Sequence, residues 1–183
     1  MAQYVTDMTK RPIEMLLGLI NNDNGFGFVE SDVEILAPQT QDADEAGRNT
    51  SVMVDLEELP SEAEDDFVTF TYERIDLQTL FGQASPSFRQ VDVPLNGSGV
   101  PEDSDVFYTE LLRKFGVAFN EADFSYVPKS AGVITIAAAA TNLAYIGEFD
   151  ITVGSSLATR VPNVILAGFE IPAEPVAEPE PVE

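Results

Sequence analysis

The side chains that most often carry out catalysis are missing from this sequence or lack their usual partners. Its 183 residues include no His and no Cys, which excludes the commonest general base, the commonest transition-metal ligand and any thiolate nucleophile. Ser104, Ser155 and Ser156 therefore have no histidine to activate them. Lys129 follows a proline, in a setting typical of a surface turn. We predict a protein that is not an enzyme and binds no cofactor.

Carboxylates and side-chain amides are the remaining groups with chemistry of their own. The stretch Asn21–Gly25 has alternating oxygens that could cage calcium, but it lacks the glycine and the bidentate glutamate that complete a calcium loop. We interpret it as the end of a helix, because Asn and Gly tolerate the left-handed backbone found there. Two loops are rich in acid, which we interpret as solvated charge with divalent-cation binding as the alternative. Their acidic residues are Asp42, Asp44, Glu45, Glu62, Glu64, Asp65 and Asp66. We predict no metal site.

The charge of the chain restricts its partners. Acidic residues number 32 and basic residues 9, so the net charge is −23, and such a field repels phosphate and anionic lipid. The basic residues form no patch, so we predict that neither nucleic acid nor a membrane is a partner. With 44% hydrophobic residues, 12 Phe and 5 Tyr, the chain is apolar enough to fold. It shows no secretory signal and no apolar run of membrane-spanning length.

An amphipathic helix is predicted from about Arg11 to Asn21, with Pro12 in its first turn. Met15 and Leu19 fall on a second side of this helix, away from its main apolar stripe. We keep two interpretations of that side, a helix buried on two sides and an exposed contact for a partner. The main stripe comprises Ile13, Leu16, Leu17 and Ile20.

Three strands are predicted after this helix, and three more after a second helix. The second helix begins at Asp103 or Ser104 and ends at Gly116, the residue expected at a helix C-terminus. Residues 39–49 are predicted to be a loop. From Glu73 to Val100 the pattern weakens, with one helical turn suggested by Leu77, Leu80 and Phe81 and a flexible hinge at 96–101. The predicted strands, taken from alternating apolar residues, are 32–36, 52–56, 67–72, 123–127, 133–138 and 145–153.

The same short pattern joins each helix to its strands. Gly25–Val33 and Gly116–Phe124 share Gly, Phe, Glu and Asp at the same relative positions. Because the order of predicted elements is also the same, we predict an α+β fold built from a duplicated unit. Each unit would be one helix and a three-stranded antiparallel meander, with the two helices packed on β-sheet. The alternative is an ordinary α+β domain without duplication.

Four parts of the chain follow from these elements, with extended arms at both ends. Residues 1–8 are an N-terminal arm, 9–95 the first unit and a linker, 96–160 the second unit, and 161–183 a strap and a disordered acidic Pro/Glu tail. Short meanders also leave edge strands, which favour self-association or strand addition. The predicted contact residues are Tyr4, Val5, Met15, Leu19, Val164, Leu166, Phe169 and Ile171.

Five short motifs are spread along the chain. They are the first helix with Asn22-Asp-Asn-Gly25, then Gly47-Arg-Asn-Thr50, Thr69-Phe-Thr-Tyr-Glu-Arg-Ile-Asp-Leu77, Glu110-Leu-Leu-Arg-Lys-Phe-Gly116 and Ala144-Tyr-Ile-Gly147. Together they resemble an uncharacterised domain carried by virion structural proteins of large tailed bacteriophages, over about residues 10–155. These motifs are structural, so no functional residue is carried over. The acidic Pro/Glu tail departs from that domain and leaves the place of this chain in a particle open.

This resemblance implies a non-enzymatic bacteriophage virion structural protein, with capsid decoration or cement ahead of a tail or baseplate component. Its partners would be other virion proteins, namely the major capsid or tail protein, with self-association as a further expectation. It would be located in the virion after assembly in the host cytoplasm. A host- or glycan-binding module is the alternative, using exposed aromatic residues such as Tyr4, Phe88 or Tyr126. A carboxylate-based hydrolase is the third hypothesis.

Overall fold

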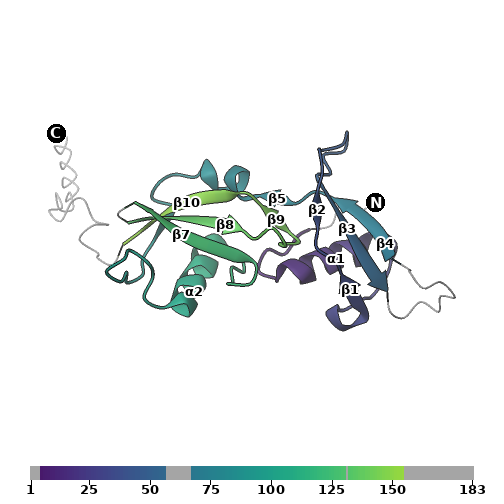
Figure 1. Cartoon of the computed structure of the whole chain (residues 1–183), viewed down its shortest axis with the longest axis horizontal. Coiled ribbons are helices and arrows are strands. Elements are labelled where there is room, and N and C mark those ends of the chain that lie inside the picture. The colour runs from purple at the N-terminus through teal and green to yellow at the C-terminus, as the bar shows by residue number, and fades with distance from the viewer. Residues whose placement is uncertain (1–4, 57–66, 131, 155–183) are drawn as a thin grey trace, which may run out of the picture.

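The structure is a computed structural model that describes residues 5–56, 67–130 and 132–154. Helices and strands occur together, which confirms the predicted α+β class. Figure 1 shows an elongated molecule with helix α1 (Pro12–Asn24) and one sheet at one end. Helix α2 (Ser104–Phe115) and a second sheet form the other end.

Helix α1 begins and ends at residues suited to its termini. Pro12 occupies the first turn, where its missing N–H removes no helical hydrogen bond. The Glu14 carboxylate accepts a 2.9 Å hydrogen bond from the N–H of Arg11, the N-cap residue. At the other end Gly25 has a φ of 72° and donates its N–H to the carbonyl of Asn21 at 2.8 Å. The helix is longer at its C-terminus than predicted.

The first sheet has a central strand flanked on both sides. β4 pairs antiparallel with one side of β3, and β1 and β2 both pair antiparallel with its other side. β4 has the bounds predicted from its alternating residues, whereas β2 lies in the segment predicted as a loop, so that prediction is wrong. The strands of this sheet are β1 (Val33–Ile35), β2 (Gln39–Thr40), β3 (Thr50–Leu56) and β4 (Phe67–Tyr72).

One edge of this sheet is interrupted at a proline. Ile35 is opposite Val54 in β3, whereas Gln39 is opposite Ser51, so the register moves by one residue between β1 and β2. Pro38 lies at this break, where a residue without an N–H donor is tolerated. A short 3-10 turn, η1 (Glu30–Asp32), leads into β1.

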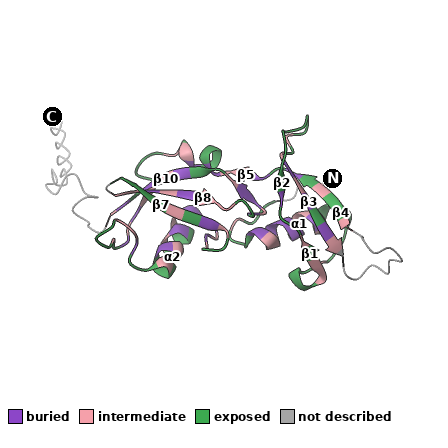
Figure 2. Ribbon diagram, in the orientation of Figure 1, coloured by how far each residue is buried: buried purple, intermediate pink, exposed green. Residues whose placement is uncertain are grey.

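Helix α1 covers one face of the first sheet. Leu16 and Ile20 of the helix pack against Val52, Val54 and Tyr72 of the sheet, and all five are buried. Figure 2 shows this burial on α1 and β3, with exposed residues on the far side of the sheet. Residues two apart on a strand share a face, so the buried positions of β3 face α1.

The second sheet also pairs antiparallel around a central meander. β8 pairs with β7 on one side and with β10 on the other, and β6 adds to β10 in parallel. The predicted bounds of β8 are confirmed, and β7 is longer than predicted. The strands of this sheet are β6 (Gln90–Val91), β7 (Phe124–Ser130), β8 (Val133–Ala138) and β10 (Glu148–Val153).

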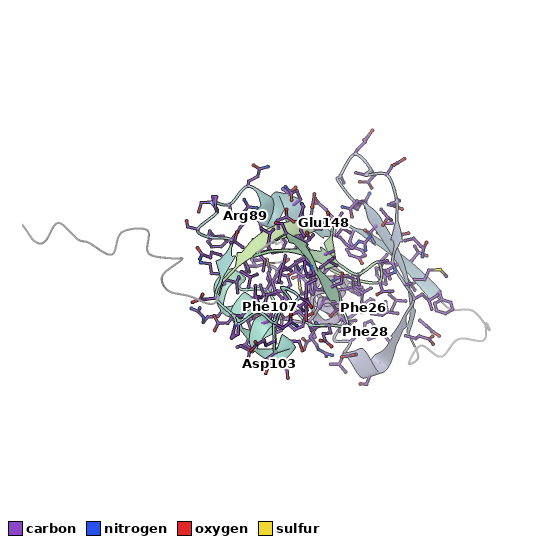
Figure 3. The ribbon with its side chains drawn as sticks, turned by 60° about the vertical axis from the view of Figure 1, so that its left-hand side comes forward. Phe26, Phe28, Arg89, Asp103, Phe107 and Glu148 are labelled. Atoms are coloured by element: carbon purple, nitrogen blue, oxygen red, sulfur yellow. The ribbon has the colours of Figure 1, made fainter. Side chains whose placement is uncertain are left out.

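Helix α2 packs on the second sheet through aromatic side chains. Phe107 meets Tyr126 of β7 edge-on at 5.0 Å between ring centroids, and Phe115 meets Phe149 of β10 at 5.5 Å. Asp103 caps the helix by accepting hydrogen bonds from the next turn, at 2.9 and 3.1 Å. Figure 3 shows Phe107 among the crowded interior side chains, with Asp103 beneath it. This is the larger of the two cores.

A small third sheet connects the two ends of the molecule. β5 (Ile75–Asp76) pairs in parallel with β9 (Tyr145–Ile146), and β5 continues into the short π-helix η2 (Gln78–Gly82). The predicted strand 145–153 is divided by Gly147, whose φ is 77° and whose added Cβ would lie 2.8 Å from a carboxylate oxygen of Asp76. Glycine is required there by both backbone and space.

The two joints that follow the helices have matching geometry. Gly116 has a φ of 68° and donates its N–H to a carbonyl four residues back at 2.8 Å, as Gly25 does. In the first joint the Asp32 carboxylate accepts the N–H of Val29. In the second joint the Asp123 carboxylate accepts from the side chain of Asn120. A strand begins at the next residue in both cases.

Candidate interaction surface

The three predicted contact residues that the structure describes differ in how far they are exposed. Val5 is 88% exposed, Met15 is only 5% exposed within the larger core, and Leu19 is half-buried against the smaller core. Met15 is thus almost wholly buried, which agrees with the interpretation of a helix buried on two sides. The remaining predicted contacts lie outside the described residues and are Tyr4, Val164, Leu166, Phe169 and Ile171.

Candidate chemical groups do not converge in the described part of the chain. Among residues 5–56, 67–130 and 132–154, no group of three or more acidic residues could hold a metal ion. The amide of Asn21 holds the joint after α1, since it accepts the N–H of Phe28 and donates to its carbonyl, at 2.9 and 2.8 Å. Its side chain is thus used for local structure. No described helix is long and apolar enough to cross a membrane.

The two exposed aromatic candidates lie against the core of the second half. Phe88 is 40% exposed and meets the ring of Phe115 edge-on, with the ammonium of Lys114 5.5 Å from its centroid. Tyr126 is half-buried and packs on Phe107. Each ring therefore stabilises a helix–sheet contact and also presents part of its surface to solvent.

A buried arginine joins the first sheet to the loop before β9. Arg74 is 3% exposed, and its guanidinium donates to the hydroxyls of Thr50 and Thr40 at 2.8 and 2.6 Å. It also donates to the carbonyl of Asn142 at 3.0 Å. Asn142 is itself buried and accepts the N–H groups of Ala144 and Tyr145. These bonds hold the two halves of the molecule together.

Among the described residues, the hydrogen-bond partners of the Arg74 guanidinium are all neutral oxygens. Burial lowers the pKa of this group, and the nearby Tyr72 phenol opposes that shift. Tyr72 also donates its hydroxyl to the carbonyl of Leu143 at 2.7 Å, beside Asn142. A buried cation is stabilised here by hydrogen bonds without an acidic partner among the described residues. Nothing in the sequence pattern marks this arginine, because its partners are up to 68 positions away along the chain.

The N-terminal arm covers the second joint but not the first. The N–H of Ala118 donates to the carbonyl of Met8 at 3.0 Å, and Met8 packs against the larger core. In the first joint Phe26 and Val29 are 46% and 56% exposed. Part of the arm therefore belongs to the folded body.

The open face of the second sheet is polar. Asp150 accepts hydrogen bonds from the Lys129 ammonium and the Thr135 hydroxyl, both at 2.7 Å. These two bonds lower the pKa of the Asp150 carboxyl, and the bond from Lys129 has the larger effect. The corresponding face of the first sheet carries Met53, which is 42% exposed, with Thr69 opposite it on β4. Val127, opposite Thr135 on this face of the second sheet, is 60% exposed, so exposed apolar side chains occur on both sheets.

Three of the four edges of the two four-stranded sheets carry features that oppose pairing with another strand. β7 carries Pro128 and the exposed Lys129, with a register shift between Pro128 and Ser130. The β1–β2 edge is interrupted at Pro38, and β6 is only two residues long. Proline, exposed charge, bulges and short length are the usual protections of an edge strand.

The remaining edge, β4, has none of these protections. Phe67-Val-Thr-Phe-Thr-Tyr72 pairs with β3 over six consecutive residues without a register shift, and it contains no charged residue and no proline. In the part of the chain that the structure describes, nothing pairs with its outer side. An uncharged, regular edge is an exception in a chain with a net charge of −23.

A groove runs alongside this edge, between β4 and α1. It consists of two adjoining hollows that share Leu16, Leu19 and Tyr72. Each has a cavity volume of about 60 Å³, which suits single side chains rather than a whole ligand molecule, since ligand pockets typically have several hundred Å³. Leu19, a predicted contact residue, thus lies in the groove. The further lining residues are Thr6, Met15, Ile20, Asp23, Asn24, Phe70, Thr71, Glu73, Ile75, Leu143 and Ala144.

Comparisons with known proteins place the chain in a family without assigning it an activity. No curated protein matches the chain, and no solved structure does. A family model matches residues 6–182, which is nearly the whole chain. The chain belongs to this family, which is described as a family of unknown function, DUF7941.

Proposed function

We propose that this protein is a non-enzymatic structural component of a tailed bacteriophage particle, with capsid decoration or cement as its first assignment. The observation that carries the proposal is the unprotected β4 edge beside an apolar groove, a surface suited to binding protein. The resemblance of its motifs to a phage virion domain supports the particle as the setting. Its partners would then be other virion proteins.

The charge of the chain is compatible with such a role. A net charge of −23 keeps many copies soluble and apart before assembly. Contacts would then form where uncharged residues are exposed, and β4 is such a place. Assembly would take place in the host cytoplasm, and the mature protein would be located in the virion.

We also propose that the fold arose by duplication of one helix and one three-stranded meander. The support is the pair of matching joints, in which glycines with φ of 72° and 68° end the helices. The aspartates of both joints immediately precede a strand. Both helices pack on one face of an antiparallel sheet. The two units differ in their edges, so duplication alone would not give them the same partners.

Two alternatives have specific observations in their favour. A tail or baseplate component would use the same unprotected edge, since an edge strand does not distinguish head from tail. A host- or glycan-binding module would use exposed rings, and Phe88 is 40% exposed with a cation beside it.

The proposal is tested by adding the purified full chain to phage particles that lack it. We expect saturable binding at a constant ratio to the major capsid protein. Saturation on isolated tails instead would assign the protein to the tail, and binding to neither would overturn the proposal. A chain lacking residues 1–5 tests the arm without removing Met8, whose carbonyl accepts the N–H of Ala118. Unchanged binding by that variant would exclude Tyr4 and Val5 as contacts.

A further inference from the structure

We propose that β4 accepts an extended segment of a different protein, which adds to the first sheet as a further strand and places an apolar side chain in the groove beside α1. The partner segment would be uncharged in its middle and basic at its ends. This inference deepens the proposed function by naming the contact site and the chemistry of the partner, and it rests on that function only in requiring a protein partner.

The backbone of β4 is oriented for such pairing. The N–H of Leu36 donates to the carbonyl of Met53, so the backbone groups of Met53 point toward β1. The backbone N–H and carbonyl groups of its neighbours Val52 and Val54 therefore point the other way, toward Phe70 and Val68 of β4. The alternate residues Thr69 and Thr71 then direct their N–H and carbonyl groups outward.

These outward groups form an acceptor edge for a strand. Thr69 and Thr71 are both exposed, and no hydrogen bond among the described residues occupies their main-chain groups. A strand added there would form main-chain hydrogen bonds with both residues. Main-chain bonds supply affinity without selecting a sequence, so selection must come from side chains.

The groove supplies that selection. Alternate residues of an added strand would point to the same face as Phe70 and Tyr72, which is the face covered by α1. Leu16, Leu19 and Ile20 of α1 line the hollow on that side, next to Phe70. Leu19 and Phe70 are only half-buried and have apolar surface left to cover. One aliphatic side chain of the partner would fill this hollow.

The charges around the edge determine what the partner carries at its ends. Glu73 follows the strand and is exposed, and Asp23 lines the groove. Among the described residues, no Lys or Arg lines either hollow. Lys or Arg at the ends of the partner segment would therefore be attracted, and carboxylates repelled.

The same charges oppose pairing of β4 with a second copy of this chain. A second copy would bring another Glu73 and Asp23 to an edge that already carries both of these carboxylates. Both copies also carry a net charge of −23. We therefore assign the edge to a different protein.

The variant Thr69→Pro tests the edge without removing a hydrogen bond of the sheet. The N–H of Thr69 points away from β3, and proline is tolerated in edge strands at such positions. The matched control is Thr69→Ser, which keeps the N–H and the hydroxyl. Leu19→Ala tests the groove separately. Protection of the Phe70 amide, which faces β3, reports that each variant is folded.

The probe is the acetylated and amidated peptide Lys-Thr-Val-Thr-Val-Thr-Lys, added to the full chain and followed by amide hydrogen exchange and by titration. We expect slower exchange at Thr69 and Thr71 but not at Phe70. Affinity should fall by about tenfold or more for Thr69→Pro, by less for Leu19→Ala, and not for Thr69→Ser. A peptide with Glu at both ends should bind more weakly.

Three results would overturn the inference. The first is equal affinity, or no binding, for the wild-type chain and Thr69→Pro. The second is a dimer of the free wild-type chain that Thr69→Pro makes monomeric, because the occupant is then a second copy. The third is protection of the Thr69 amide in the free monomer that is lost when residues 1–5 or 155–183 are removed, because the occupant is then the chain itself.

Failure of this inference and failure of the proposed function give different results. Particles that bind wild type and Thr69→Pro equally would leave the particle role standing and remove the β4 contact. Peptide binding that follows the predicted order, without any binding to particles, would leave the β4 contact standing and remove the particle role. Figure 1 shows the C-terminal end of β10 at the opposite end of the molecule from β4.

Discussion

The guanidinium of Arg74 donates a 3.0 Å hydrogen bond to the main-chain carbonyl of Asn142, and this contact joins the first sheet to the loop that enters β9. Arg74 lies between β4 and β5, whereas Asn142 lies between β8 and β9. The parallel pair β5–β9 begins beside it, where the N–H of Ile75 donates to the carbonyl of Ala144 at 2.9 Å. The buried arginine thus positions the connection between the two halves.

Replacing Arg74 by Met should destabilise the protein by about 2–4 kcal/mol, because it leaves the hydroxyl of Thr50 and the carbonyl of Asn142 without their buried donor. Urea denaturation followed by circular dichroism measures this change. The control is Arg113→Met, since Arg113 is 67% exposed in its side chain and is paired with Glu110 at the surface. We expect a change within about 0.5 kcal/mol for the control, and equal effects of both variants would contradict the role given to Arg74.

Removing the side-chain hydroxyl should raise the stability of the protein at one buried tyrosine and lower it at another. Tyr145 is fully buried and its hydroxyl has no hydrogen-bond partner among the described residues, so Tyr145→Phe should stabilise by about 1 kcal/mol. Tyr72 donates to the carbonyl of Leu143 at 2.7 Å, so Tyr72→Phe should destabilise by about 1–2 kcal/mol. Thermal and urea unfolding of both variants checks the signs. A loss of stability in Tyr145→Phe would show that its hydroxyl has a partner.

Replacing the glycines that end the helices by a residue with a side chain should destabilise the protein because of their backbone conformation alone. Gly25 and Gly116 have φ of 72° and 68°, and a Cβ at either position meets no atom within 4 Å. Replacing either by Ala should therefore cost about 1 kcal/mol through the left-handed conformation. Gly27 is the matched control, because it has equal space and no positive φ. Gly27→Ala should be neutral or slightly stabilising in the same unfolding measurement, and a loss as large as at Gly25 would contradict the explanation.

Alkaline pH should reduce stability through buried tyrosines. Burial raises the pKa of Tyr72 to about 12, whereas a tyrosine in the unfolded chain titrates near pH 10. Between these values the folded state keeps a proton that the unfolded state has released, so stability is complete below about pH 10 and falls as pH rises toward 12. The slope due to Tyr72 is about 1.4 kcal/mol per pH unit.

Urea unfolding at a series of alkaline pH values measures this slope, and tyrosinate absorbance identifies the titrating groups. Tyr72→Phe should have a shallower slope than the wild type. Burial also raises the pKa of Tyr108 to about 12, with the charges of Tyr126 and Glu121 adding to that effect, so part of the slope should persist in the variant. Identical slopes for both proteins would exclude Tyr72 as a source.

Local chemistry and periodicity made several elements predictable from sequence. Strand 67–72 and strand 133–138 have the bounds predicted from their alternating residues. The end of α2 was predictable at Gly116, since few residues other than glycine accept the backbone found there, whereas α1 runs on to Asn24 before Gly25 ends it. The contact side of α1 was predicted at Leu19 and Met15; both line the groove, but only Leu19 has surface left to cover.

One feature of the candidate site is visible in the sequence. The run Phe67-Val-Thr-Phe-Thr-Tyr72 is free of charge in a chain with 32 acidic residues. Its importance depends on its place in the sheet, because the same run in a central strand would simply be core. Which strand lies at an edge follows from pairing between distant segments, and periodicity carries no information on that.

The sequence alone thus determined the helices, the main strands, the joints and the acidic character, because each depends on residues close together in the chain. Only the tertiary structure decided that Met15 is buried, that Gly147 divides the predicted last strand, and that Arg74 bonds to Asn142. It also decided that β4 is an edge with a groove beside it. These features require segments far apart in the sequence to pack together, and burial, space and hydrogen-bond partners are properties of that packing.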